Sequence, residues 1–454
     1  MTAALLPLEL AAVPRAAAVP RATSPAAVWG ARFLTLVLAA FAAGAFFGFA
    51  RALVALTVLG FAGAALGWPR PSAALLAIGL LCTLDPLTRT MVLEGGWLRW
   101  NTLNYGLILV ILASVPRLLR STSPPVRLLA MLLALLAIGL FWSPGRMDGL
   151  QHILGAVAFF GLLVYFLRAS RDPDIWFWIA VVNGATAAAG GLLYFVGEIG
   201  PDLEINPNAW SYFPLTALFS ICLAACASPR KGRLVLSLLS VVNFGWVFLT
   251  GSRGSLVIAA ACMTFLAVRL AGAAPRIALF AAAALCALLL SSALGQRESY
   301  ALSRIGKLLD PGESLTGRTS GRSDLARAAW QMFLDHPVLG MGTGGFASHW
   351  ARLQEGEGIS SFGYGHEMQA HAAWMKTLAE NGLPGFLLLA AFVLSFAVSG
   401  WKRRASGLLL PGLLVTAVLA LAFVSTEFQS KGLWFLSAGG VTLLCGRAQR
   451  ERAR

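Results

Sequence analysis

Long apolar stretches alternate with short polar connectors along most of the chain, and many of these stretches are as long as a membrane-spanning helix. An α-helix rises about 1.5 Å per residue, so about 20 apolar residues cross the ~30 Å hydrocarbon core of a bilayer. The pattern predicts an all-α polytopic membrane protein with an even number of spans, roughly 12–14. The expected spans are 30–49, 52–68, 72–86, 102–116, 127–142, 150–167, 175–197, 208–227, 233–250, 255–271, 276–295, 383–400, 407–424 and 433–446.

One long polar stretch, residues 296–382, interrupts this pattern and gathers His, Arg, Asp, Glu and Gly at high density. Its apolar residues and turn signals predict a small, mostly helical extramembrane unit rather than a disordered linker. The domain organisation that follows is a tail over 1–29, a bundle over 30–295, the loop over 296–382, C-terminal helices over 383–446 and a basic tail over 447–454.

The polar stretch predicts two helices separated by a turn. Residues 323–333 carry apolar side chains at helical spacing, with Ser320 or Ser323 as the cap and Asp335-His336-Pro337 as the stop. A second helix is expected over 367–380, ended by Asn381-Gly382. The intervening segment 340–345 matches G-x-G-x-x-G, but it follows a helix rather than a strand. It therefore predicts a tight turn and not a nucleotide-binding loop.

Composition and charge placement then set the orientation. Hydrophobic residues make up 58% of the 454 residues and charged residues 12%, with a formal net charge of +15. The cations concentrate in alternate connectors, which the positive-inside rule assigns to the cytoplasm, so no nucleic-acid partner is expected. Both termini are then cytoplasmic and stretch 296–382 faces outward. Three connectors share the outer face: 143–149, 198–208 and 250–254.

Sequence features of metal and nucleotide sites are weak or missing. The six cysteines all lie within apolar runs, where they are typical of small buried hydrophobic residues, so no disulfide is expected. Acidic residues on the outer face are few and scattered, and we expect neither a divalent metal nor any other cofactor. Charged residues inside the spans are also rare, which argues against a proton-coupled transporter.

Three arginines on the outer face are candidates for binding an anion. Arg253 lies in a short connector rich in Gly and Ser, where the positive-inside rule disfavours a cation. Arg322 stands at the N-terminal end of the helix predicted over 323–333, whose free N–H groups and dipole also favour an anion, and Arg318 lies four residues earlier. The alternatives are a snorkelling headgroup anchor for Arg253 and solvated cations for the other two.

His371 is the candidate general base, because an imidazole near neutral pH can accept a proton from an attacking hydroxyl. It is predicted on the second loop helix, and a structural or interfacial role is the alternative. Glu380 could bind substrate, orient a neighbour or cap the helix end. Asn206 and Asn208 could bind a sugar or phosphate, although Asn208 as a helix N-cap is the safer interpretation. His336 and His349 are weaker candidates.

These residues, taken in order, resemble the O-antigen ligase / O-antigen polymerase superfamily of bacterial envelope proteins. The matching pieces span roughly 190–400, and the first half of the chain matches only in hydropathy. They are Asn206-Pro-Asn208, Thr250-Gly-Ser-Arg253-Gly, Arg322 before an amphipathic helix, Asp335-His-Pro-Val-Leu-Gly-Met-Gly-Thr-Gly344, His371, and Leu378-Ala-Glu-Asn-Gly-Leu-Pro-Gly385. The family usually has Asn after the His, whereas this chain has Ala372, which removes any role for that Asn.

The resemblance implies a GT-C-like membrane glycosyltransferase of the bacterial inner membrane. Its expected reaction transfers an undecaprenyl-diphosphate-linked glycan to a sugar hydroxyl of lipid A–core on the periplasmic face, without ATP or metal. Ligase is favoured over polymerase, which would pass the glycan to another lipid-linked repeat. Two alternatives from other classes are a lipid-linked glycan transporter and a structural envelope protein that binds lipid.

Overall fold

The computed structural model describes residues 24–47, 71–90, 123–169, 174–196, 207–227, 232–270, 321–357, 370–425 and 430–451, with a few isolated positions between them. All regular structure in these ranges is helical, which confirms the all-α prediction. The predicted spans 52–68, 102–116 and 276–295 fall almost entirely outside the described residues, so the total of 12–14 stays a prediction.

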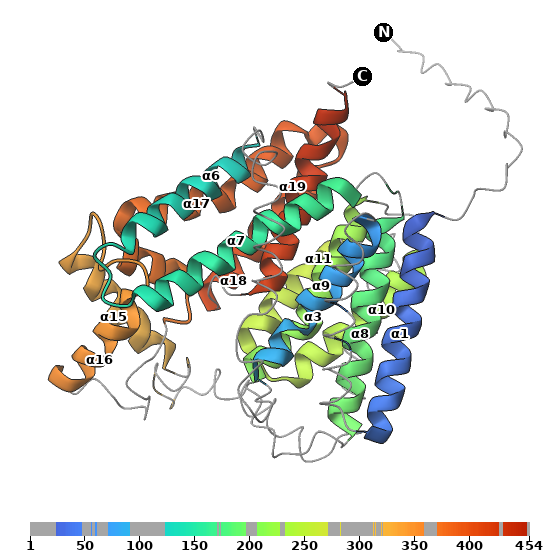
Figure 1. The fold of residues 1–454 in the computed structure, drawn as a ribbon, viewed down its shortest axis with the longest axis horizontal. Helices are drawn as coiled ribbons and strands as arrows, with labels where there is room; N and C mark the ends of the chain where they lie inside the picture. The colour runs from blue at the N-terminus through green and yellow to red at the C-terminus, as the bar shows by residue number, and fades with distance from the viewer. Residues whose placement is uncertain are drawn as a thin grey trace, which may run out of the picture.

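The helices follow one another as Figure 1 shows. They are α1 (Pro25–Phe47), α3 (Pro71–Thr90), α6 (Pro124–Gly139), α7 (Arg146–Ala169), α8 (Ile175–Val196), α9 (Pro207–Ala227), α10 (Arg233–Leu249), α11 (Arg253–Leu270), α15 (Arg322–Asp335), α16 (Gly345–Glu357), α17 (Ala373–Lys402), the short η2 (Arg404–Ser406), α18 (Leu409–Ser425) and α19 (Lys431–Glu451). Among the described residues, five are long and apolar enough to cross a membrane, namely α1, α8, α9, α11 and α17.

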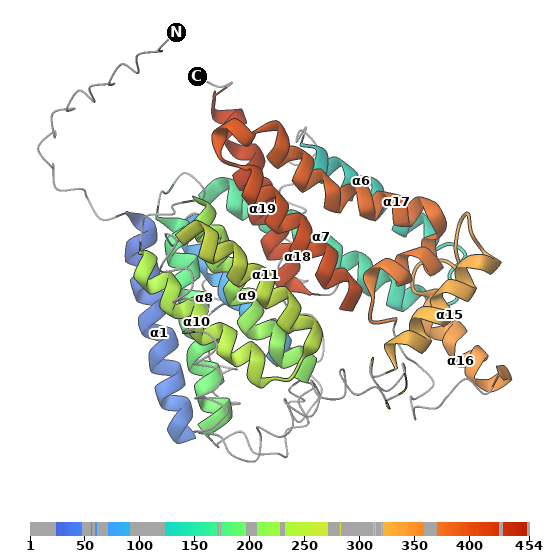
Figure 2. The same cartoon turned by 180° about the vertical axis from the view of Figure 1, so that it is seen from behind.

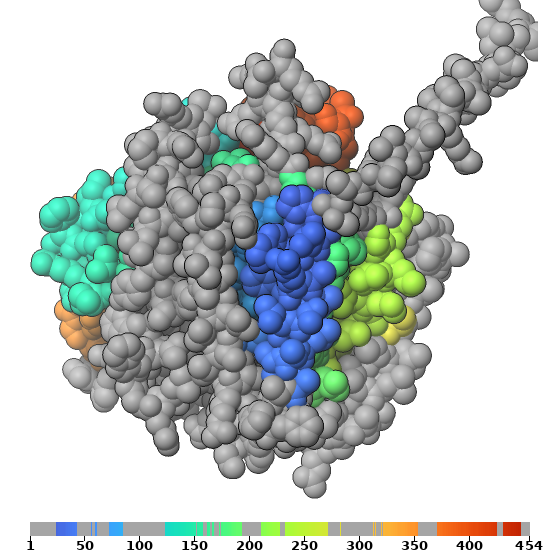
Figure 3. All heavy atoms as spheres, turned by 45° about the vertical axis from the view of Figure 1, so that its right-hand side comes forward, coloured from blue at the N-terminus to red at the C-terminus, as the bar shows by residue number. Residues whose placement is uncertain are grey.

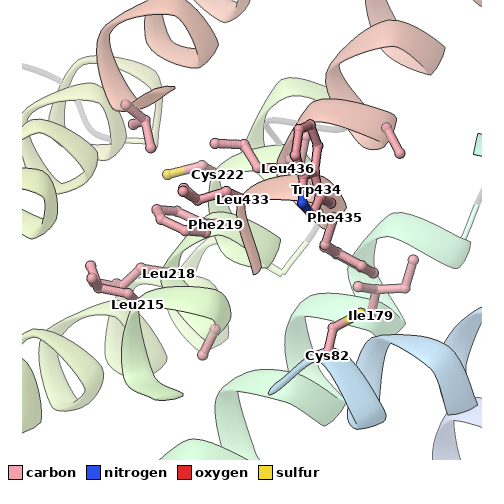
Figure 4. Close-up of a cluster of buried hydrophobic side chains, with 14 of the residues drawn as sticks. Cys82, Ile179, Leu215, Leu218, Phe219, Cys222, Leu433, Trp434, Phe435 and Leu436 are labelled. Carbon is pink, nitrogen blue, oxygen red and sulfur yellow. The ribbon is translucent and has the colours of Figure 1, made fainter. Parts of the chain in front are cut away.

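Helix α9 is the centre of the bundle. It packs against α3, α8, α10, α11 and α19, and almost all of its apolar window is buried. A helix that is apolar all round must be surrounded by other helices or lipid, and here helices surround it. Figure 4 shows part of the resulting core, in which Phe219 and Cys222 of α9 lie beside Leu433 of α19. Helix α1 lies on the outer flank of this group, where Figure 3 shows its surface.

A second group of helices carries the loop. Helix α17 packs between α6 and α18, and α7 lies beside α19 (Figure 2). Gly400 of α17 faces Gly412 of α18, where an added Cβ would come within 3.0 Å of the facing Cα. Such small residues allow close approach of membrane helices. Helix α17 breaks at Gly382, whose φ of +62° is left-handed, so the predicted stop at Asn381-Gly382 is confirmed.

Helices α15 and α16 form a small separate core against the start of α17. Leu325, Ala329 and Met332 of α15 meet Phe346 and Trp350 of α16. Ala328, Ala370 and Ala379 complete this cluster. The described part of the loop is therefore packed, and it rests on the start of α17.

Contacts between distant segments show which helix ends lie at the same end of the bundle. Ser24 donates to Asp174 at 2.8 Å, which joins the start of α1 to the start of α8. Ser211 and Ser255 share a 2.6 Å hydrogen bond at the opposite side, where α9 and α11 both begin. Connector 143–149 packs against 342–344, so this connector shares an end with the loop, as predicted.

Candidate functional site

The turn between α10 and α11 presents Arg253 as the first residue of α11. Thr250 closes α10, with its hydroxyl donating to the Val247 carbonyl at 2.7 Å, and Gly251 has a left-handed φ of +65°. Thr250 and Ser252 are buried, whereas Arg253 is partly exposed. The turn therefore leaves Arg253 at the edge of the bundle, while the Thr250 hydroxyl is hydrogen-bonded inside it.

A chain of serine hydroxyls ties this turn to α9. Ser252 donates to Ser255 at 3.0 Å, and Ser255 bonds Ser211 of α9 at 2.6 Å. Asn208 lies three residues before Ser211 in the first turn of α9, so it belongs to the same corner. Because α9 begins at Pro207, Asn208 is inside the helix and the prediction that it caps α9 is wrong. Asn206 and the Asn208 side chain lie outside the described residues.

Arg322 is the first residue of α15, as predicted, but the cap differs from the expectation. Gly321 occupies the N-cap position with a left-handed φ of 77° and has no side chain to cap the helix, so the prediction of Ser323 in this role is wrong. Thr319 instead accepts the Ser323 N–H at 3.2 Å and donates to its hydroxyl at 3.0 Å. A glycine can reverse the chain here at no steric cost, which makes a serine cap unnecessary. Arg318 and Ser320 lie outside the described residues.

His371 is not on a helix, which corrects the prediction of a helix over 367–380. Helix α17 begins at Ala373, residues 370–372 are not helical, and His371 is exposed with a φ of 50°. It is the one non-glycine residue with a positive φ among those described. Such backbone conformations cost about 1–3 kcal/mol and cluster at functional sites. Trp374 holds the following turn, because its indole donates to the Ala420 carbonyl of α18 at 3.0 Å.

Segment 340–345 is a tight turn, as predicted, and it interlocks with two other segments. Met341 and Gly342 donate backbone hydrogen bonds of 2.9 and 2.8 Å to Ala379 and Glu380 of α17. A Cβ on Gly344, whose φ is +88°, would lie 2.2 Å from the backbone N of Gly149. Glycine is therefore required where the turn meets connector 143–149.

A buried polar network behind this turn was missed by the sequence analysis. Lys376 Nζ lies 2.8 Å from His152 Nε2 and 3.9 Å from Glu380 Oε1, and all three side chains are almost fully buried. Glu380 Oε1 also accepts the N–H of Phe346 at 3.1 Å, in the first turn of α16. Glu380 therefore orients neighbours, one of the roles named for it. The i, i+4 spacing of Lys376 and Glu380 was a usable signal, but nothing near His152 pointed to its partner.

Helix α16 was also missed, although Phe346, Ala347 and Trp350 have the spacing of a buried helical face. Its His349 is about half-buried, and burial, with a smaller effect of Arg352, lowers the pKa of its imidazole. His349 therefore stays neutral at pH 7. His336 is exposed directly after α15, at the predicted stop.

A second buried lysine, also missed, lies at the start of α19. Lys431 is 1% exposed, and a Cβ on the next residue, Gly432, would lie 2.3 Å from the Thr216 hydroxyl of α9. A cation at a helix N-terminus opposes the helix dipole, and its burial is costly. Such a position in a membrane protein points to a functional role.

The candidate residues lie on helices that share neighbours. Helix α11, which Arg253 begins, packs against α18, and α18 also packs against α17, which follows His371. Helix α15, which Arg322 begins, packs against α17 as well. Packing through α17 and α18 therefore links the helices that begin at Arg253 and Arg322 to the helix that follows His371.

Comparison with known proteins gives one match, to part of the chain. Residues 236–390 match the family model described as O-antigen ligase. The match includes Arg253, Arg322, His371 and the turn at 340–345, whereas Asn208 and His152 precede it. No curated protein matches the chain. The chain is thus a multi-pass membrane protein in which one segment, roughly a third of its 454 residues, is similar to the O-antigen ligase family.

Proposed function

We propose that this protein is an O-antigen ligase of the bacterial inner membrane. It transfers a glycan from undecaprenyl diphosphate to a sugar hydroxyl of lipid A–core on the periplasmic face. The observation that carries the proposal is Arg253 at the start of α11, tied through Ser255 and Ser211 to the start of α9 and lying within the O-antigen ligase match. An outward-facing arginine fixed at a helix start suits a lipid-linked diphosphate lying at the membrane interface.

In the proposed reaction, Arg253 and Arg322 hold the diphosphate, with Arg318 and the asparagines of the α9 start as further contacts. Guanidinium groups bind phosphate oxygens in pairs and stabilise the negative charge that grows on the leaving group. Removing one such donor typically lowers kcat by roughly 10²–10³-fold.

His371 then acts as the general base. The acceptor hydroxyl attacks the anomeric carbon, a new C–O bond forms, and the bond from that carbon to the diphosphate oxygen breaks with inversion. The proton of the hydroxyl goes to the imidazole, and undecaprenyl diphosphate leaves with the bonding electron pair. General base catalysis of this kind contributes typically about 10²–10⁴-fold. The energy of the reaction is stored in the glycosyl–diphosphate bond, so no nucleotide is required.

An assay with purified protein, lipid-linked donor and lipid A–core tests the proposal. We expect transfer by the wild type, loss of transfer in Arg253→Ala and His371→Ala with normal membrane insertion, and impaired transfer in Arg322→Lys. Normal glycan capping of lipopolysaccharide in the two alanine variants would refute these roles.

The same assay distinguishes the alternatives. Chain growth with donor alone would identify an O-antigen polymerase, the other activity found in this superfamily. Movement of donor across vesicles without bond formation would identify a transporter, and binding alone would identify a structural protein. Each of these results would overturn the ligase proposal.

A further inference from the structure

Exposed apolar side chains gather at one end of the loop. Trp330, Leu334, Val338 and Leu339, here called the apolar edge, lie on the second half of α15 and the turn after it. Leu334 is 59% exposed and Val338 66%. The first half of α15 is polar, with Ser323, Asp324 and the exposed Arg327. Contiguous exposed apolar surface of this kind marks an interaction site.

The apolar edge continues the lipid-facing surface of α17. The exposed residues of this membrane helix recur on one face, at Leu383, Leu387, Leu394, Val398 and Trp401. Leu383 N donates to the Pro337 carbonyl at 2.9 Å, and a Cβ on Gly382 would touch the Val338 carbonyl at 2.4 Å. The turn bearing Val338 and Leu339 therefore lies directly at the outer end of the α17 surface.

Residues 140–150, which include connector 143–149, carry further exposed apolar side chains on the other side of the glycine turn. Phe141 is 80% exposed and Met147 64%, with Trp142 and Leu150 also exposed. This connector contacts segment 342–344, so it borders the same part of the loop as the apolar edge. Aromatic residues at this level are typical of the membrane–water interface.

The polar start of α15 also agrees with contact to lipid. In Figures 1 and 2, α15 and α16 lie beside the starts of α17 and α7, at the end of these helices that carries the loop. Arg327, on the exposed side of α15, can reach headgroups from its long apolar stem.

We propose that the apolar edge inserts into the outer leaflet of the bilayer that the bundle spans. Trp330, Leu334, Val338 and Leu339 contact the region where headgroups meet acyl chains, and α15 lies with its polar start higher in the interface. This anchor fixes the depth of α15, which begins at Arg322, relative to lipid phosphates. The inference concerns lipid contact and does not depend on the glycan transferred.

Spin labels on the full-length protein in lipid nanodiscs test the insertion. Single cysteines replace Leu334, Val338, Leu387 or Arg352 in a variant without the six native cysteines. Leu387 on α17 is the lipid-facing reference, and Arg352, exposed on α16, is the matched loop control. Collision rates with oxygen, which concentrates in lipid, and with a nickel chelate, which stays in water, report depth. We expect labels at 334 and 338 to favour oxygen several-fold over the chelate, as at 387.

Two outcomes would overturn the proposal. If labels at 334 and 338 are as accessible to the nickel chelate as the label at 352, the apolar edge lies in water. Spin–spin broadening at 338 that disappears on dilution with unlabelled protein would show that a second copy covers the edge instead of lipid. The measurement needs no transfer activity, so its failure is separate from failure of the proposed ligase reaction.

Discussion

At the scale of single residues, His371 combines a strained backbone with an exposed side chain. Its left-handed φ directly before α17 separates it from the helix on which the sequence placed it. Trp374, bonded to α18, and Lys376, bonded to His152, hold the first turn of α17 on both sides. The strain at His371 is therefore maintained by neighbours that are themselves fixed.

His371→Asn separates this backbone role from the chemical one. Asparagine tolerates the left-handed conformation but cannot act as a base near neutral pH, so we expect an unchanged melting temperature and transfer lowered roughly 10²–10⁴-fold. Initial rates and thermal unfolding of the detergent-solubilised protein measure the two effects. Wild-type transfer by the asparagine variant would show that His371 is not the base.

At the scale of elements, the glycine turn at 340–345 joins three segments that are distant in sequence. It donates backbone hydrogen bonds to α17 and fits against connector 143–149 through positions where a side chain has no room. The Thr343 hydroxyl donates to the Leu136 carbonyl of α6 at 2.8 Å and accepts the Asn381 side-chain N–H at 2.8 Å. The turn is therefore a structural junction of the loop with the bundle.

Gly344→Ala tests this junction, with Gly407→Ala as the matched control. Both glycines are left-handed, but Gly344 faces backbone atoms within 2.3 Å whereas Gly407 has open space. We expect Gly407→Ala to cost about 1–2 kcal/mol from backbone strain, and Gly344→Ala to cost roughly 1–3 kcal/mol more from overpacking. Equal losses of thermal stability in the two variants would refute the close packing at Gly344.

The buried Lys376 gives a second element-scale prediction. Lys376→Met leaves Glu380 buried without its cation, and we expect a loss of about 3–5 kcal/mol of stability. Adding Glu380→Gln removes the uncompensated charge but keeps an oxygen for the Phe346 N–H, so the double variant should recover at least about 1 kcal/mol. Chemical unfolding in detergent measures both, and a double variant no more stable than Lys376→Met would contradict the pairing.

At the scale of the whole molecule, the two ends of the bundle differ in charge and in contacts. The described part of the loop and the turn bearing Arg253 occupy one end, while α17 ends at the other with Lys402, followed by Arg403 and Arg404. Arg403 donates to the Leu444 carbonyl of α19 and so joins the ends of two helices there. The positive-inside rule predicts that this second end is cytoplasmic.

Cysteine labelling in intact cells tests the orientation. A membrane-impermeant maleimide should label Arg352→Cys and not Arg404→Cys, because these exposed positions lie at opposite ends. Permeabilised cells, in which both positions should react, provide the control. The reverse pattern in intact cells would invert the topology and move the proposed site to the cytoplasm.

The sequence predicted features that depend on local pattern. Apolar runs located most of the described helices. The predicted starts at 255 and 323 lie within two residues of the observed starts at Arg253 and Arg322, and the stop at Asn381-Gly382 coincides with the break at Gly382. Features set by tertiary contact could not be predicted. The Lys376–His152 contact joins residues 224 positions apart, and His152 looks like an ordinary histidine in an apolar run. The cap of α15 was missed because a left-handed Gly321 replaced a serine side chain.

The break at Gly382 bears on how substrates exchange. Before the break, α17 accepts backbone hydrogen bonds from Met341 and Gly342, and after the break it donates one to Pro337. Both parts of α17 are therefore fastened to the turn that follows α15. Because of these bonds, α15 and the turn that follows it cannot move away from the bundle unless α17 tilts with them. For the proposed ligase, we therefore expect the lipid-linked donor to reach the site sideways from the outer leaflet, without an opening of the loop. We also expect transfer to depend on bilayer thickness, because the thickness sets the tilt of α17.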